Sequence, residues 1–128
     1  MKKAGWILAA LITFFLLPAS VAPKLVGAQA AVASLTAIGW PTSHLVALGM
    51  LELALLLLFL WPRTALLGAV LFTALLGGTV ASHLRAGSPL ASHTLFGIYL
   101  GVFLWGSLFL RDAAFRSYVL NHMLGRSP

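Results

Sequence analysis

One acidic side chain, Glu52, lies in the middle of an apolar stretch, residues 44–61, that contains no other charged residue. A carboxylate in a hydrocarbon environment costs several kcal/mol unless it is protonated or paired. Two roles are therefore open for Glu52. It binds a ligand or exchanges a proton, or it is held in a buried ion pair or hydrogen bond that fixes the register of its helix. We give the two roles equal weight.

Basic side chains border the apolar stretches at positions that an antiparallel bundle would bring near Glu52. The ends of the first and third spans and the starts of the second and fourth would share one side of the membrane. Glu52 comes eight residues after His44, which is roughly 12 Å along a helix. We predict one outward-facing polar pocket on that side, in which cations pair with Glu52. The predicted ligand-binding residues are Glu52, His83, Arg85, Lys24, His93 and His44.

Several kinds of chemistry have no support in the sequence. It contains no cysteine, which excludes disulfides, thiol relays, iron–sulfur clusters and cysteine-ligated zinc. No two histidines stand three or four residues apart, and we expect no metal or haem site. We predict no catalytic residue, and we expect the chain not to be an enzyme on its own. Arg111 and Asp112 are expected to stop a helix and pair at the surface, at the opposite end from Glu52.

The composition defines the elements that must position these residues. Of 128 residues, 61% are hydrophobic and only 8% are charged, which is too few charges to solvate the surface of a globular domain. The apolar stretches are continuous, which favours helices over a transmembrane barrel. The sequence predicts an all-α, four-helix transmembrane bundle as a single domain over residues 1–128, with spans at about 5–22, 44–61, 65–82 and 93–110.

Shorter elements are expected outside the spans. A weakly amphipathic stretch between the first and second spans predicts a short interfacial helix that ends at Gly39, Trp40 and Pro41. Pro18 is expected to kink the first helix. That helix resembles a secretory signal, but the further spans favour its retention over cleavage after Ala22. The cytoplasmic tail covers residues 111–128, and its part from Phe115 to Pro128 is predicted to lie along the membrane surface.

The basic residues predict the orientation of the chain. The net charge of +6 would suggest nucleic acid in a soluble protein, but here the cations stand between the spans, so we expect no nucleic-acid partner. Six of them would be cytoplasmic and two, Lys24 and Arg85, outside, which places both termini in the cytoplasm. The six are Lys2, Lys3, Arg63, Arg111, Arg116 and Arg126.

Pairs of small residues four apart predict how the helices associate, because close backbone approach replaces the hydrophobic effect between helices in lipid. Packing within one bundle is favoured over a seam between two copies, although a homo-oligomer stays open. The pairs are Gly77 with Ala81, Gly78 with Ser82, and Gly97 with Gly101.

A series of short motifs runs along the chain in a characteristic order and spacing. The motifs are Leu48-Gly49-Met50-Leu51-Glu52-Leu53, Pro62-Arg63-Thr64, Leu76-Gly77-Gly78, His83-Leu84-Arg85, Leu104-Trp105-Gly106 and Leu110-Arg111-Asp112, with Lys24 and Gly39-Trp40-Pro41. In these motifs the chain resembles the DoxX-like family of small bacterial integral membrane proteins. The resemblance covers nearly the whole chain, and it implies a four-helix protein of the bacterial inner membrane. Some members of the family are associated with quinone-linked oxidoreductases, including the thiosulfate:quinone type, or with oxidative-stress assemblies.

Three functions are compatible with these features. The leading hypothesis is a non-catalytic subunit of a quinone-linked or redox-associated membrane assembly, in which Arg85 or His83 donates hydrogen bonds to a small lipophilic ligand such as a quinone. The partner would be a soluble or membrane oxidoreductase subunit. The alternatives are a small transporter or proton-coupled permease that uses Glu52, and a structural membrane anchor that holds a soluble partner through its basic tail.

Overall fold

The computed structural model describes residues 1–125 and confirms an all-helical fold with four helices long and apolar enough to cross a membrane. These spans run over Lys2–Leu25, Thr42–Leu60, Ala65–Ala86 and Leu90–Arg111. The elements are α1 (Lys2–Leu16), the π-helical turn η1 (Leu17–Val21), α2 (Ala22–Leu25), α3 (Gln29–Ala37), the 3-10 turn η2 (Thr42–His44), α4 (Leu45–Leu60), α5 (Ala65–Ala86), the π-helical turn η3 (Leu90–Thr94), α6 (Phe96–Arg111), α7 (Ala113–Tyr118) and the π-helical turn η4 (Val119–Met123).

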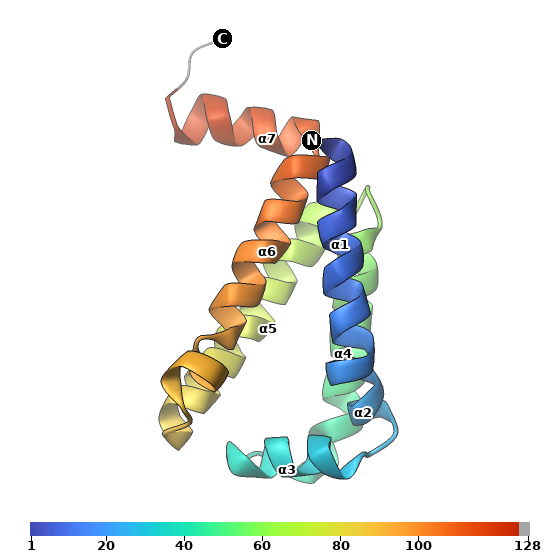
Figure 1. Ribbon diagram of the computed structural model, residues 1–128, viewed down its shortest axis with the longest axis vertical. Helices are drawn as coiled ribbons and strands as arrows, with labels where there is room; N and C mark the ends of the chain where they lie inside the picture. Colours follow the sequence, from blue (N-terminus) through green and yellow to red (C-terminus); the bar gives the residue numbers. More distant parts are fainter. Residues whose placement is uncertain (126–128) are drawn as a thin grey trace.

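The helices form a bundle that is closed at one end and splayed at the other (Figure 1). α1 packs against α6, α6 against α5, and α5 against α4. Toward the end that carries α3, the pair α5 and α6 diverges from α1 and α4, and α3 runs across the gap (Figure 1). α7 lies across the opposite end, at an angle to α6 (Figure 1). We call these the α3 end and the α7 end.

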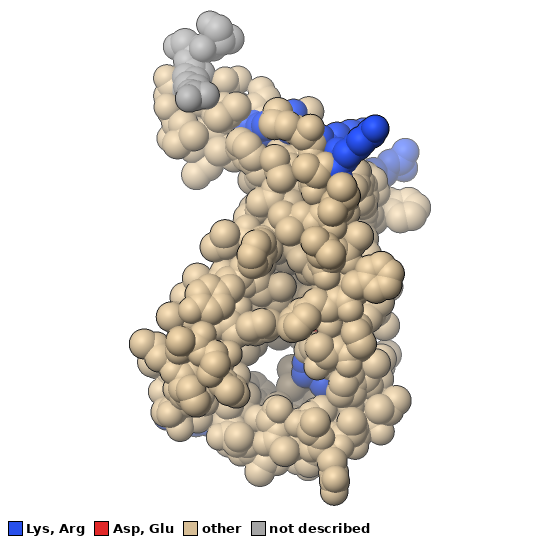
Figure 2. Space-filling view, viewed as in Figure 1, with Lys and Arg blue, Asp and Glu red and all other residues tan. Residues whose placement is uncertain are grey.

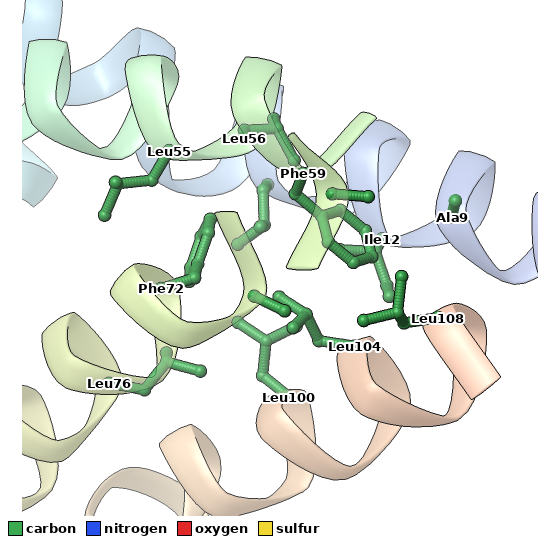
Figure 3. Close-up of a cluster of buried hydrophobic side chains, with 13 residues drawn as sticks. Ala9, Ile12, Leu55, Leu56, Phe59, Phe72, Leu76, Leu100, Leu104 and Leu108 are labelled. Atoms are coloured by element: carbon green, nitrogen blue, oxygen red, sulfur yellow. The ribbon is translucent and has the colours of Figure 1, made fainter. Parts of the chain in front are cut away.

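The apolar core occupies the half of the bundle nearer the α7 end. Side chains from all four spans point toward one another there (Figure 3). Phe59 of α4 and Phe72 of α5 are almost fully buried, and Leu104 of α6 packs with them. A buried hydrogen bond from Ser107 Oγ to the Gly5 carbonyl, 2.8 Å long, ties α6 to α1 in the same half. This core does not extend into the half near α3, where the polar side chains of Lys24 and Glu52 lie.

Only some of the predicted glycines make close helix contacts, and another glycine makes one that was not predicted. Gly97 packs against α5 as expected, since a Cβ there would lie 2.9 Å from Val80 Cγ2. Gly77 and Gly78, however, have no atom within 4 Å of an added Cβ, so their motifs do not join helices within this chain. Gly68 instead meets the backbone of Phe59, where α5 turns back along α4. Sequence spacing missed Gly68 because the tight turn before it, rather than a small-residue motif, creates the contact.

The Gly68 contact predicts a large difference between two similar substitutions. Gly68→Ala should destabilise the bundle by about 1–3 kcal/mol, because its Cβ overlaps backbone that cannot move aside easily. Gly77→Ala, on the same helix and facing open space, should change stability by less than about 1 kcal/mol. Unfolding of the purified variants by SDS titration in mixed micelles measures both. Equal effects at the two positions would contradict the packing described here.

The first and third spans continue several residues past their predicted ends, which changes where the polar residues lie. The first helix continues to Leu25 through η1, so Pro18 is accommodated by a π-helical turn and Lys24 lies on the helix. α5 continues to Ala86, so His83 and Arg85 belong to its last turns instead of a loop. These two polar side chains do not end α5. Gly87, with a φ of +71°, does so by adopting the left-handed conformation that favours glycine.

The prediction of a surface pair between Arg111 and Asp112 was wrong. Asp112 Oδ1 instead accepts a hydrogen bond of 3.0 Å from the Phe115 amide and caps α7. Arg111 is only 7% exposed and turns inward, where its guanidinium lies over the rings of Trp6 and Phe59. Its Nη atoms donate to the Phe59 and Leu60 carbonyls at the end of α4. The open carbonyls at the end of α4 give the guanidinium acceptors, while Asp112 is used to cap α7.

The basic residues gather at the α7 end, where Lys and Arg atoms are prominent (Figure 2). The start of α1 supplies Lys2 and Lys3, the turn between α4 and α5 supplies Arg63, and α7 supplies Arg116. Lys24 and Arg85 lie on α2 and α5 at the α3 end. Arg126, which was counted with the cytoplasmic group, lies outside the described residues. The division of charge between the two ends otherwise follows the predicted one.

Candidate functional site

Glu52 forms a compact polar group with two residues of the first span. Lys24 Nζ lies 2.6 Å from Glu52 Oε2 in an ion pair. Lys24 Nζ also donates to Ser20 Oγ over 2.5 Å, and Ser20 Oγ donates to Glu52 Oε2 over 3.0 Å. We call Ser20, Lys24 and Glu52 the Lys24–Glu52 cluster. The Glu52 side chain is 7% exposed and that of Lys24 is 24% exposed, so the carboxylate is buried and its partner reaches accessible space.

Local sequence spacing assembles this cluster. Ser20 and Lys24 are four residues apart on a continuous helix, which puts their side chains on one face. Gly49 precedes Glu52 by three residues and lies on the same face of α4. A Cβ at Gly49 would be 2.8 Å from Lys24 Cβ, so only glycine lets the lysine stem lie against α4 at this point. Gly49 therefore sets the approach that brings the ammonium to the carboxylate.

The cluster keeps one acceptor and one donor available to a ligand. The hydrogen bonds from Ser20 and Lys24 to Glu52 both end on Oε2, and within residues 1–125 Oε1 has no hydrogen-bond partner. Oε1 is nevertheless accessible. Within residues 1–125, Arg111 Nε is the one side-chain polar atom that is both fully buried and without a partner, so Oε1, which also lacks a partner, is not fully buried. An ammonium has three N–H donors, and Lys24 uses two of them here. A ligand with a hydroxyl and a carbonyl could bond to both groups.

Two predicted histidines form a second group. The rings of His83 on α5 and His93 on η3 lie 5.8 Å apart between centroids, inclined by 64°. His83 Nδ1 is 3.0 Å from Ser88 Oγ, and His93 Nδ1 is 2.8 Å from Ser92 Oγ. Residues 1–125 contain no cluster of three or more side chains suited to a metal ion. This pair fastens the end of α5 to the start of the fourth span.

Arg85 belongs to a third group, which joins α5 to the segment after α3. Arg85 Nη2 donates to the Ile38 carbonyl over 3.2 Å. Trp40 Nε1 donates to Ser82 Oγ over 3.1 Å. The ring of His44 stands edge-on to Trp40, with 6.3 Å between centroids. These contacts hold α3 across the α3 end.

All six predicted site residues thus lie at one end of the bundle, but in separate groups. Lys24 contacts Glu52, whereas no hydrogen bond or ion pair of the described residues joins Arg85 or His83 to it. Ser20 was not predicted as a site residue, although its position one helical turn before Lys24 was an available signal. Which helix faces turn toward Glu52 depends on helix rotation, and spacing along the chain does not fix it.

An opening separates the two pairs of helices at this end. Figure 2 shows it passing between the arm of α5 and α6 and the arm of α1 and α4, with α3 closing it below. Atoms of a basic residue are visible inside it (Figure 2). The first span and α4, which carry the Lys24–Glu52 cluster, form one wall, and α5 forms the other. The surrounding helices are otherwise almost entirely apolar.

Four apolar spans around a buried ion pair define a multi-pass integral membrane protein. The model of the DoxX-like family matches residues 7–107, and the chain belongs to that family. This agrees with the resemblance drawn from the motifs in the sequence. No curated protein and no solved structure shows significant similarity to the chain.

Proposed function

We propose that the protein binds a small lipophilic molecule with a polar head, such as a quinone, at the Lys24–Glu52 cluster. In this proposal it is a non-catalytic subunit of a quinone-linked or redox-associated assembly in the bacterial inner membrane. The observation that carries the proposal is the free Glu52 Oε1 beside the Lys24 ammonium, in a bundle that opens at that level. Ligand sites in proteins combine a mostly apolar cavity with a few placed polar groups in this way.

The polar groups suit the head of a quinone. A quinone carbonyl accepts a hydrogen bond, and the free N–H of Lys24 supplies one. A quinol hydroxyl also donates, and Glu52 Oε1 accepts. In this proposal Lys24, which contacts Glu52, is the hydrogen-bond donor in place of Arg85 or His83, the donors expected from the sequence. The long apolar tail would leave between the two helix pairs into the lipid.

The orientation completes the proposal. Positive residues favour the cytoplasmic side, and the α7 end carries most of them. The N-terminus and α7 are therefore assigned to the cytoplasm, and the Lys24–Glu52 cluster to the outer half of the membrane. An oxidoreductase partner on either side would exchange quinone with this site through the bilayer.

Ligand titration tests this function. Wild-type protein in nanodiscs is titrated with a short-chain ubiquinone analogue, and quenching of tryptophan fluorescence reports binding. The double variant Lys24→Met with Glu52→Leu removes both polar groups together and leaves no unpaired charge. We expect its Kd to be at least about tenfold higher, a loss of about 1.4 kcal/mol.

The control for this titration is Arg63→Gln, which alters an exposed cation at the α7 end and should bind as the wild type does. Absence of saturable binding to the wild type, or equal binding by the double variant, would refute the proposal. Proton flux into liposomes that Glu52→Gln abolishes, without quinone binding, would instead establish the proton-coupled permease.

A further inference from the structure

Arg85 is a cation without an acidic partner at the α3 end. The ion pair between Lys24 and Glu52 is the one salt bridge found within residues 1–125. Arg85 makes a single hydrogen bond, from Nη2 to the Ile38 carbonyl. A guanidinium has five N–H donors, so most of those on Arg85 are unused by the described residues. The positive charge of this end is therefore concentrated on Arg85.

These unused donors border a cavity of about 280 Å³ between α5 and the segment that follows α3. The cavity is lined by Gly39, Trp40, Ala81, Ser82 and Arg85. The Trp40 ring forms one side of the cavity, and its hydrogen bond to Ser82 fixes its orientation. Gly39 has a φ of +79°, and a Cβ there would come within 3.1 Å of Arg85 Nη2. Glycine thus allows the turn and keeps space open beside the guanidinium.

We propose that this cavity binds the phosphate of an anionic phospholipid headgroup. Arg recognises phosphate with paired N–H donors, and its planar fork suits the tetrahedral oxygens. A water molecule takes about 30 Å³ in the liquid, so 280 Å³ has room for a phosphate and part of its glycerol. The site is separate from the Lys24–Glu52 cluster and does not rest on the quinone proposal.

The surroundings favour a lipid phosphate over a free one. Trp40 is 42% exposed next to the guanidinium, and an indole at the end of a span is typical of the interface between lipid and water. Leu84 and Leu90, on either side of the turn that follows Arg85, are 65% and 60% exposed. Exposed apolar side chains at this end indicate that it faces lipid, and a phospholipid brings acyl chains to such a surface whereas inorganic phosphate does not. Basic residues close to spans are known headgroup contacts.

Native mass spectrometry of the full chain, released from detergent with added lipid, tests the proposal. We expect phosphatidylglycerol to bind at least about fivefold more tightly than phosphatidylcholine, whose choline cation Arg85 repels. Arg85→Gln should remove this preference, and Arg85→Lys should keep part of it because the charge remains without the fork. Ala81→Leu should weaken binding by filling the cavity without changing charge, and it serves if Arg85→Gln does not fold.

Two control variants and one competing anion show which results would contradict the proposal. Arg63→Gln removes a cation at the α7 end, and the double variant Lys24→Met with Glu52→Leu empties the other site. Both should keep the wild-type lipid preference. Equal binding of the two lipids by the wild type, or the same loss in Arg63→Gln as in Arg85→Gln, would overturn the proposal. Competition by millimolar inorganic phosphate as effective as that by phosphatidylglycerol would overturn the lipid assignment in favour of a soluble anion.

Discussion

Lys24→Met should destabilise the bundle by about 3–5 kcal/mol, because it leaves the buried Glu52 carboxylate without its cation. Ser20 would remain as the single described hydrogen-bond donor to Glu52. One hydroxyl cannot replace an ammonium, since a hydrogen bond recovers only part of the cost of burying a charge. Unfolding by SDS titration in mixed micelles, at neutral pH, measures the loss.

Two further variants show whether the unpaired charge causes this loss. Lys3→Met removes an exposed lysine at the start of the same span and should change stability by less than about 0.5 kcal/mol. Adding Glu52→Leu to Lys24→Met should restore most of the stability, because an apolar pair avoids the burial of a charge. If Lys24→Met were no more damaging than Lys3→Met, Glu52 would have to be stabilised by something other than its ion pair.

Arg111→Leu is the second change with a large expected effect, a loss of about 2–3 kcal/mol at the α7 end. The substitution leaves the Phe59 and Leu60 carbonyls at the end of α4 without their donor, and each orphaned group costs about 1–3 kcal/mol. It also removes the contacts of the guanidinium with the rings of Trp6 and Phe59. Arg111 Nε is itself buried without a partner, and its removal in Arg111→Leu recovers part of the lost stability, so the expected loss stays at the lower end.

Arg111→Lys separates the charge from the shape of the side chain. A lysine keeps a cation near the carbonyls but lacks the planar group that lies against two rings, and it should recover about half of the loss. Arg63→Leu, at an exposed position of the same end, should stay within about 0.5 kcal/mol of the wild type. Thermal unfolding in detergent compares the four proteins. If Arg111→Leu left the stability unchanged, the packing of α6 against the end of α4 would not depend on this contact.

The candidate site was predictable in part. The intramembrane acid and the placement of cations at span ends were enough to bring Lys24 to Glu52, because alternating helix direction follows from span number alone. Helix rotation then decided the rest. It placed Ser20 against Glu52, whereas Arg85 and His83 face other partners on the opposite side of the opening. Arg111 was misassigned because its neighbour in sequence, Asp112, is not its neighbour in space.

The amino-acid sequence by itself determined the membrane class, the four spans, the short helix between the first two, and the family. These properties depend on runs of apolar residues and on local motifs, which are read along the chain. The tertiary structure alone decided that Gly49 and Gly68 set the helix contacts, that the bundle opens at the α3 end, and that the polar residues divide into three groups. Each of these depends on how helices rotate and tilt against one another, and side-chain packing fixes that only once the chain is folded.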